Sequence, residues 1–208
     1  MRRLGIREIR LFSGLVLLFF VISHLVNHAL GLFSLGAMEK GLGWFMLLWR
    51  HPLATALLYG SVIIHFLLGL HALYRRRTLR MPPHEAAQLA LGLVLPFLIL
   101  QHVGGTRISH ALGGIEANYA RVIYGLWIAN PVNGARQVIA LLVAWLHSCL
   151  GIYFWLRHRV WFGQYSLWLY TAALLLPLFA LLGFAEAGMD LSARGYRPPP
   201  ARYCRSVI

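Results

Sequence analysis

The sequence predicts an all-α fold, an integral membrane helical bundle with five transmembrane helices and short interfacial helices in the outer loops. Two observations carry this prediction. Of the 208 residues, 59% are hydrophobic and only 12% are charged, whereas soluble domains carry about 25% charged residues. In addition, five apolar runs reach or approach the roughly 20 residues that a helix needs to cross the hydrocarbon core of a bilayer, so membrane lipid is an expected partner.

The predicted spans are separated by loops rich in arginine, proline or aromatic residues. They cover about residues 10–33, 52–74, 85–110, 134–156 and 166–184. The two outer loops, which follow the first and third spans, contain residues 38–49 and 118–129. Both stretches mix aromatic and aliphatic side chains, which indicates short helices in the membrane interface. Residues 1–187 are predicted to form the transmembrane domain. Residues 188–208 are predicted to form a polar, disordered tail or linker.

Arginine is unevenly distributed between the two sides that alternating spans create. The N-terminal segment and the loops at 75–80 and 157–159 share one side and hold ten arginines. The loops of the other side hold fewer basic residues, namely Lys40, Arg50, Arg107, Arg121 and Arg136. Basic residues concentrate in cytoplasmic loops, so a cytoplasmic N-terminus is predicted. The same placement explains the net charge of +13, and no nucleic-acid partner is expected.

Histidine is the feature that points to a function. The chain has ten histidines, and ionisable residues inside a bilayer are costly and usually functional. Those near loops or span ends are expected to be solvated or interfacial: His51, His71, His84, His110 and His158. Four others stand inside four different predicted helices and are the candidate metal ligands: His24, His65, His102 and His147.

Depth divides these four candidate ligands into two pairs. His65 and His147 each stand ten residues before the arginine that ends their helix, which places both about 15 Å from the cytoplasmic side. His24 and His102 lie roughly 21–26 Å from that side. Each pair stands on two parallel helices, and the offset between the pairs suits two stacked macrocycles.

Two imidazole pairs at two depths predict two haems b per chain. Each of His65 and His147 is followed four residues later by a glycine, Gly69 or Gly151, and a glycine leaves room for a porphyrin face. Ligation by two histidines leaves the iron without an open position, so electron transfer is the expected role. Helix bundles commonly build cofactor sites from side chains on facing helices.

Three other classes of site can also place histidines inside a membrane. A proton relay usually needs carboxylates within the membrane, and the six acidic residues stand in loops or at span ends. A zinc site is less favoured because histidines at different depths cannot share one small ion, and the chain has no cysteine cluster. The remaining alternative is a haem-free membrane anchoring or assembly domain, in which the histidines hydrogen-bond between helices.

Four short motifs resemble those of the di-haem cytochrome b subunits of succinate dehydrogenase and fumarate reductase. In order, they are residues 23–28, 65–70, 102–107 and 146–151. The resemblance covers about residues 8–185, and it implies that His24 pairs with His102 and His65 with His147. A closer resemblance is to the N-terminal cytochrome-b-like membrane domain of bacterial membrane-bound adenylate cyclases. It rests on residues 23–31, 74–82 and 102–110.

This resemblance implies a protein of the bacterial inner membrane that exchanges electrons with the quinone pool. It would serve either as the redox-sensing domain of an adenylate cyclase or as the anchor subunit of a respiratory complex like succinate dehydrogenase. The implied partners are quinone and either a second copy of the chain, an iron–sulfur and cyclase region, or a flavoprotein. The related cyclase domains have six helices, so a sixth helix is expected beyond the five predicted here. Phosphate-binding loops, paired carboxylates and flavin fingerprints are absent from the sequence. This chain is therefore expected to catalyse at most the turnover of quinone, and any cyclase or dehydrogenase activity is expected to belong to another polypeptide region.

Three further residues are predicted to contact the cofactor near its ends. His28 stands one turn after His24 and, with Asn27, is expected to support the cofactor. The alternatives are that His28 replaces His24 as a ligand, bonds a propionate or binds a quinone head group. Arg107 lies at the outer end of the third span, where it would neutralise a propionate or anchor the helix in the interface.

Overall fold

The structure is a computed structural model that describes residues 5–113 and 118–198. In these ranges the chain forms helices and no strand, as the sequence predicts. Five helical stretches are long and apolar enough to cross a membrane: Ile6–Leu32, Pro52–Tyr74, Pro83–Leu112, Pro131–Leu156 and Phe162–Ala193. The predicted class, a membrane helical bundle with five spans, is confirmed.

Shorter helical segments interrupt or connect these spans. The first half of the chain contains α1 (Ile6–Ala29), the 3-10 turn η1 (Leu30–Leu32), α2 (Leu35–Trp49) and α3 (Pro52–Tyr74). The second half contains α4 (Pro83–Val103), the π-helical turn η2 (Gly104–Ile108), α5 (Ser109–Gly113), α6 (Tyr119–Ile123), the π-helical turn η3 (Tyr124–Ala129), α7 (Pro131–Leu156) and α8 (Phe162–Ala193). Proline opens α3, α4 and α7, at a position where the missing N–H costs no helical hydrogen bond.

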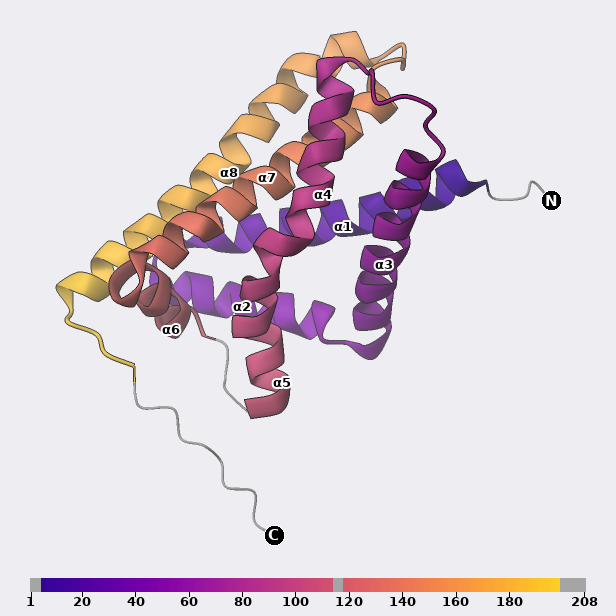
Figure 1. The fold of residues 1–208 in the computed structure, drawn as a ribbon. Coiled ribbons are helices and arrows are strands. Elements are labelled where there is room, and N and C mark those ends of the chain that lie inside the picture. Colours follow the sequence, from indigo (N-terminus) through magenta and orange to yellow (C-terminus); the bar gives the residue numbers. More distant parts are fainter. Residues whose placement is uncertain (1–4, 114–117, 199–208) are drawn as a thin grey trace.

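Two helix pairs and one long helix make up the bundle (Figure 1). α1 packs against α3, α4 packs against α7, and α8 lies along α1. The end of α1 and the turn η1 approach α8 closely, because a Cβ atom on Gly31 of η1 would collide with the backbone of Gly183 in α8, and one on Gly183 would collide with the backbone of His28 in α1. α1 also contacts α7, so the two pairs face each other across the centre of the molecule.

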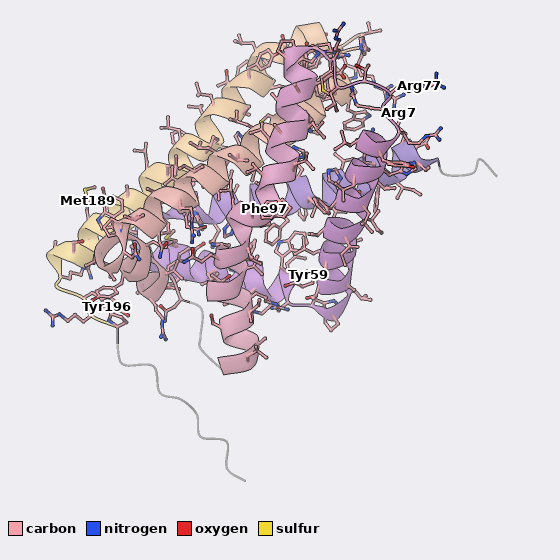
Figure 2. All side chains as sticks on the ribbon, viewed as in Figure 1. Arg7, Tyr59, Arg77, Phe97, Met189 and Tyr196 are labelled. Atoms are coloured by element: carbon pink, nitrogen blue, oxygen red, sulfur yellow. The ribbon has the colours of Figure 1, made fainter. Side chains whose placement is uncertain are left out.

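The two ends of the bundle differ in character. Residues 5–10, 75–82 and 157–161 lie at one end, called here the basic end. The first turns of α2 and all of α6 lie at the opposite end, called here the capped end. In Figure 2, Arg7 and Arg77 lie at the basic end, far from Met189 and Tyr196 at the other. At the basic end, Arg76 and Glu85 form an ion pair at 2.8 Å across the loop between α3 and α4.

The capped end has its own apolar core. α2, α6 and the last turns of α8 bury a common cluster of side chains there: Met38, Tyr119, Ile123, Ala187 and Leu191. The Glu39 carboxylate of α2 accepts hydrogen bonds from the backbone N–H groups of Tyr119 and Ala120 at 2.7 and 3.1 Å. These are orphan donors at the start of α6, so Glu39 caps that helix from another element. The predicted short helices in the outer loops are therefore present and packed together.

The predicted end of the last span is too early. α8 continues to Ala193. Gly188 lies against the ring of Trp127, where a Cβ atom would come within 2.7 Å of the indole, and Leu191 is buried in the core of the capped end. This packing keeps residues 188–193 helical, although their polar composition alone predicts a tail. The rest of the predicted tail, residues 199–208, lies outside the described residues.

Much of the apolar surface of the spans is exposed. Phe97 on α4 (labelled in Figure 2) is 78% exposed, and Phe12 and Leu174 are similarly open on α1 and α8. Exposed apolar surface of this extent marks an interaction surface. On helices of this length it fits contact with membrane lipid.

Candidate functional site

The structure brings His65 of α3 and His147 of α7 into contact. Their ring centroids lie 6.1 Å apart, with the ring planes at 89°. The Nδ1 atom of His65 is 3.1 Å from the carbonyl oxygen of Arg10 in α1, and that of His147 is 3.1 Å from the carbonyl oxygen of Gln88 in α4. Because a carbonyl only accepts, Nδ1 carries the proton in both rings, and each Nε2 keeps a free lone pair for a metal.

Two glycines make room for these rings. A Cβ atom on Gly14 of α1 would lie 2.9 Å from Cε1 of His65, and one on Gly92 of α4 would lie 2.7 Å from Cε1 of His147. Any larger residue would push the ring out of place or push the helices apart. Neither glycine is among the predicted site residues.

The predicted glycines Gly69 and Gly151 lie in more open surroundings. A Cβ atom on Gly69 would meet nothing within 4 Å, and one on Gly151 would lie 3.4 Å from Nε2 of Gln88. Open space beside Gly69 leaves room for a bulky group, and its role beside a macrocycle stays a prediction.

The second predicted pair, His24 of α1 and His102 of α4, is also in contact. The ring centroids lie 5.8 Å apart at an interplanar angle of 68°. Phe20 stacks on His24 at 6.0 Å and Phe45 of α2 lies 5.4 Å from it, so aromatic rings wall one side of this pair. The Nδ1 atom of His24 is buried and has no hydrogen-bond partner in the described structure. The π-helical turn η2 begins two residues after His102, and such turns are frequent at functional sites.

His28 and Asn27 connect this pair to the capped end. The His28 ring centroid lies 4.4 Å from that of His24 and 5.6 Å from that of Tyr119. The Asn27 amide donates a hydrogen bond of 2.7 Å to the Tyr119 hydroxyl. Burial raises the pKa of the Tyr119 phenol, so the ring stays neutral at physiological pH. Asn27 therefore ties α1 to α6, and cofactor contact by either Asn27 or His28 stays a prediction.

Two arginines near the capped end differ in their surroundings. Arg107, predicted to neutralise a propionate, lies in η2; that role stays a prediction. Arg136 in the second turn of α7 has buried Nε and Nη2 atoms without a hydrogen-bond partner among the described residues. The sequence marks Arg136 only as one of several basic residues at the outer ends of helices, so its burial could not be predicted.

The two halves of the bundle repeat one arrangement. The first span of each half carries three features in order: a backbone carbonyl that accepts a hydrogen bond from a histidine, a glycine four residues later, and a histidine ten residues after the glycine. These residues are Arg10, Gly14 and His24 in α1, and Gln88, Gly92 and His102 in α4. The equal spacing is the signal that could have singled out Gly14 and Gly92. Each half thus supplies one ring to each pair.

The residues present fit two irons held by two imidazoles each. A metal–nitrogen bond is about 2 Å long, and the centre of an imidazole ring lies about 1 Å beyond its nitrogen. Two imidazoles that bind one ion would therefore have ring centroids roughly 6 Å apart. The observed separations are 5.8 and 6.1 Å. In residues 5–113 and 118–198, no group of three or more His, Cys, Asp or Glu side chains is arranged to hold a metal ion.

Comparisons of the chain with protein-family models, with curated proteins and with solved structures give no match. The class of the protein therefore rests on its fold and site, a membrane helical bundle with two interhelical histidine pairs.

Proposed function

We propose that this chain is a di-haem b-type membrane cytochrome that exchanges electrons with the quinone pool, as the redox-sensing membrane domain of an adenylate cyclase. One observation carries the haem assignment. Four histidines from four helices form two pairs, and both pairs have ring separations near the value that ligation of one iron requires. When bound, haem supplies one-electron redox chemistry at its iron.

The surrounding residues orient the four rings. The carbonyl groups of Arg10 and Gln88 fix the Nδ1–H tautomer of His65 and His147, and this type of contact also raises the basicity of a metal-bound imidazole. Two histidines on one iron leave no open coordination position, which suits electron transfer. The two pairs lie at different depths, since His24 stands ten residues beyond Gly14, about 15 Å along α1. They provide two redox sites spread across the thickness of a bilayer.

The quinone and cyclase parts of the proposal rest on the resemblance of the four histidine motifs. The arginines of the basic end support an orientation with that end in the cytoplasm, and the resemblance implies the inner membrane of a bacterium. Reduction of the bound haems by an added quinol, followed in a stopped-flow spectrometer, tests the quinone part. No reduction by ubiquinol or menaquinol would remove it and leave the cytochrome assignment standing.

The first test is a dithionite-reduced minus oxidised spectrum of the purified, haem-supplemented chain. We expect a b-type α band and two haems per chain in a pyridine haemochrome count. Folded protein without a haem signal would contradict the proposal and favour a haem-free anchoring domain.

Removal of one ligand tests the pairing. We expect His65→Ala to retain one of two haems, because His147 alone cannot hold the second, and we expect His147→Ala to match it. His71→Ala, on the same helix α3 and outside both pairs, is the control and should retain both haems. Two haems in both ligand variants would show that the pairing is wrong.

A further inference from the structure

Arg136 is a half-buried cation whose guanidinium carries two shielded donor atoms. Its Nε and Nη2 atoms are shielded from solvent and form no hydrogen bond in the described structure. A guanidinium carries five N–H donors and stays charged at any physiological pH. An unpaired buried charge is costly, and proteins place such groups where an anion pairs with them. Carboxylate and phosphate oxygens fit the fork of a guanidinium best.

The position of Arg136 on α7 directs it toward the centre of the bundle. It precedes His147 by eleven residues, which is about three helical turns, so the two residues share one face of the helix. His147 turns this face toward His65. Arg136 therefore points into the space that the histidine pairs enclose, and its buried donor atoms agree with that direction.

Arg136 also lies at the depth of the His24–His102 pair. His147 contacts α4 at Gly92, and His102 stands ten residues beyond Gly92 toward the capped end. Because α7 runs antiparallel to α4, the eleven residues from His147 back to Arg136 lead in the same direction. Both displacements are about 15–17 Å.

Packing between α1 and α7 supports the same placement. Leu25 of α1, the residue after His24, shares a buried cluster with Leu141 and Trp145 of α7. Arg136 stands a little more than one turn beyond Leu141 toward the capped end. Its side chain is thus within the part of the bundle that surrounds His24.

We propose that Arg136 binds a propionate carboxylate of the haem held by His24 and His102. This inference rests on the proposed function and names a group that orients that haem and neutralises its charge. A fixed positive charge near an iron favours the reduced state, so Arg136 should raise the midpoint potential of this haem above that of a variant without the charge.

Redox titration of the loaded protein provides the first test. The titration is made in a His65→Ala background, which keeps only the His24–His102 haem. We expect Arg136→Gln to lower the midpoint potential, Arg136→Lys to lower it less, and Arg159→Gln, an exposed arginine at the basic end, to leave it unchanged. An unchanged potential in Arg136→Gln with the haem still bound would overturn the inference.

An esterified haem separates a propionate from other anions. Haem-depleted wild-type protein is reloaded with haem b or with its dimethyl ester. We expect the ester to bind about tenfold more weakly or worse, as for loss of charge-assisted hydrogen bonds, and Arg136→Gln to bind both forms alike. Equal binding of both forms by the wild type would overturn the inference. So would a potential that follows added chloride, phosphate or anionic lipid and ignores esterification.

The two proposals fail in different ways. If the wild type takes up no haem, the proposed function fails. If the wild type carries two haems and Arg136 affects neither potential nor ester binding, only the role of Arg136 fails. Where Arg136→Gln does not fold, Arg136→Lys replaces it in the titration, and an unchanged midpoint potential would overturn the inference.

Discussion

At the scale of single residues, Tyr119 connects the histidine pairs to the capped end. Its hydroxyl accepts from Asn27, its ring meets His28, and its backbone N–H donates to Glu39. Burial is the main cause that raises the pKa of this phenol, and the nearby Glu39 charge acts in the same direction. The ring is therefore held neutral inside a polar contact.

This raised pKa predicts a loss of stability at alkaline pH. An unfolded tyrosine loses its proton near pH 10, while folded Tyr119 keeps it. The folded state then binds more protons than the unfolded state, so stability is full below about pH 10 and falls as pH rises toward the folded pKa. We expect Tyr119→Phe to be less stable than the wild type at neutral pH by about 1–2 kcal/mol, because the Asn27 amide loses its acceptor. We also expect this variant to lose less stability than the wild type when the pH is raised.

Thermal unfolding in detergent at about pH 8 and about pH 11 measures this difference. Tyr59→Phe, on an exposed ring of α3, is the control and should show the same alkaline loss as the wild type. An alkaline loss in Tyr119→Phe equal to that of the wild type would contradict the assigned cause.

The residues that sequence reasoning found and missed differ in one physical respect. His24, His65, His102 and His147 could be paired because depth along a helix follows from residue number alone. Gly14 and the carbonyl of Gln88 matter through contacts between helices, and only the equal spacing in the two halves of the sequence could have singled out Gly14. Whether donor atoms of an arginine at a helix end are shielded from solvent, as Nε and Nη2 of Arg136 are, depends on neighbours from other elements.

At the scale of helices, a proline in α8 is matched by an indole from α7. Pro177 has no N–H and cannot bond to the carbonyl of Ala173, four residues earlier. The Trp145 Nε1–H donates to that carbonyl at 2.7 Å. The bond lies beside a buried cluster of Leu25, Trp145 and Ala180, where an unpaired carbonyl is costly.

Removal of this indole donor should destabilise the bundle. We expect Trp145→Phe to lower the free energy of unfolding by about 1–3 kcal/mol, because the Ala173 carbonyl is left without a partner. In a Pro177→Ala background the restored helical N–H takes over the carbonyl, so the same substitution should cost less. Denaturant unfolding in detergent measures both costs. Trp168→Phe, exposed on α8, is the control, and equal costs in the two backgrounds would refute this role for Trp145.

Helix boundaries show how far apolar length carries a prediction. The second span begins at Pro52 and ends at Tyr74 as the sequence predicts, since proline and a run of arginines bound it. The last span runs nine residues further than predicted, to Ala193 rather than 184. Gly188, Asp190 and Ser192 read as a polar tail, and only the packing of Leu191 against α2 and α6 makes them helical.

At the scale of the whole molecule, the two ends differ in charge and packing. The basic end gathers short arginine-rich loops, whereas the capped end buries an apolar core between α2, α6 and α8. The spans between them expose apolar side chains such as Phe97. This polarity predicts one favoured direction of insertion, with the basic end in the cytoplasm.

Cysteine labelling in spheroplasts tests this direction of insertion. The background carries Cys149→Ser and Cys204→Ser, and single cysteines are placed at the two ends. Because arginine-rich loops are retained in the cytoplasm, we expect Lys40→Cys on α2 to react with a membrane-impermeant maleimide in intact spheroplasts. Arg80→Cys, in the loop after α3, should react only after permeabilisation. The reverse pattern would show that the basic end faces outward, and it would place the His65–His147 pair nearer the outer surface.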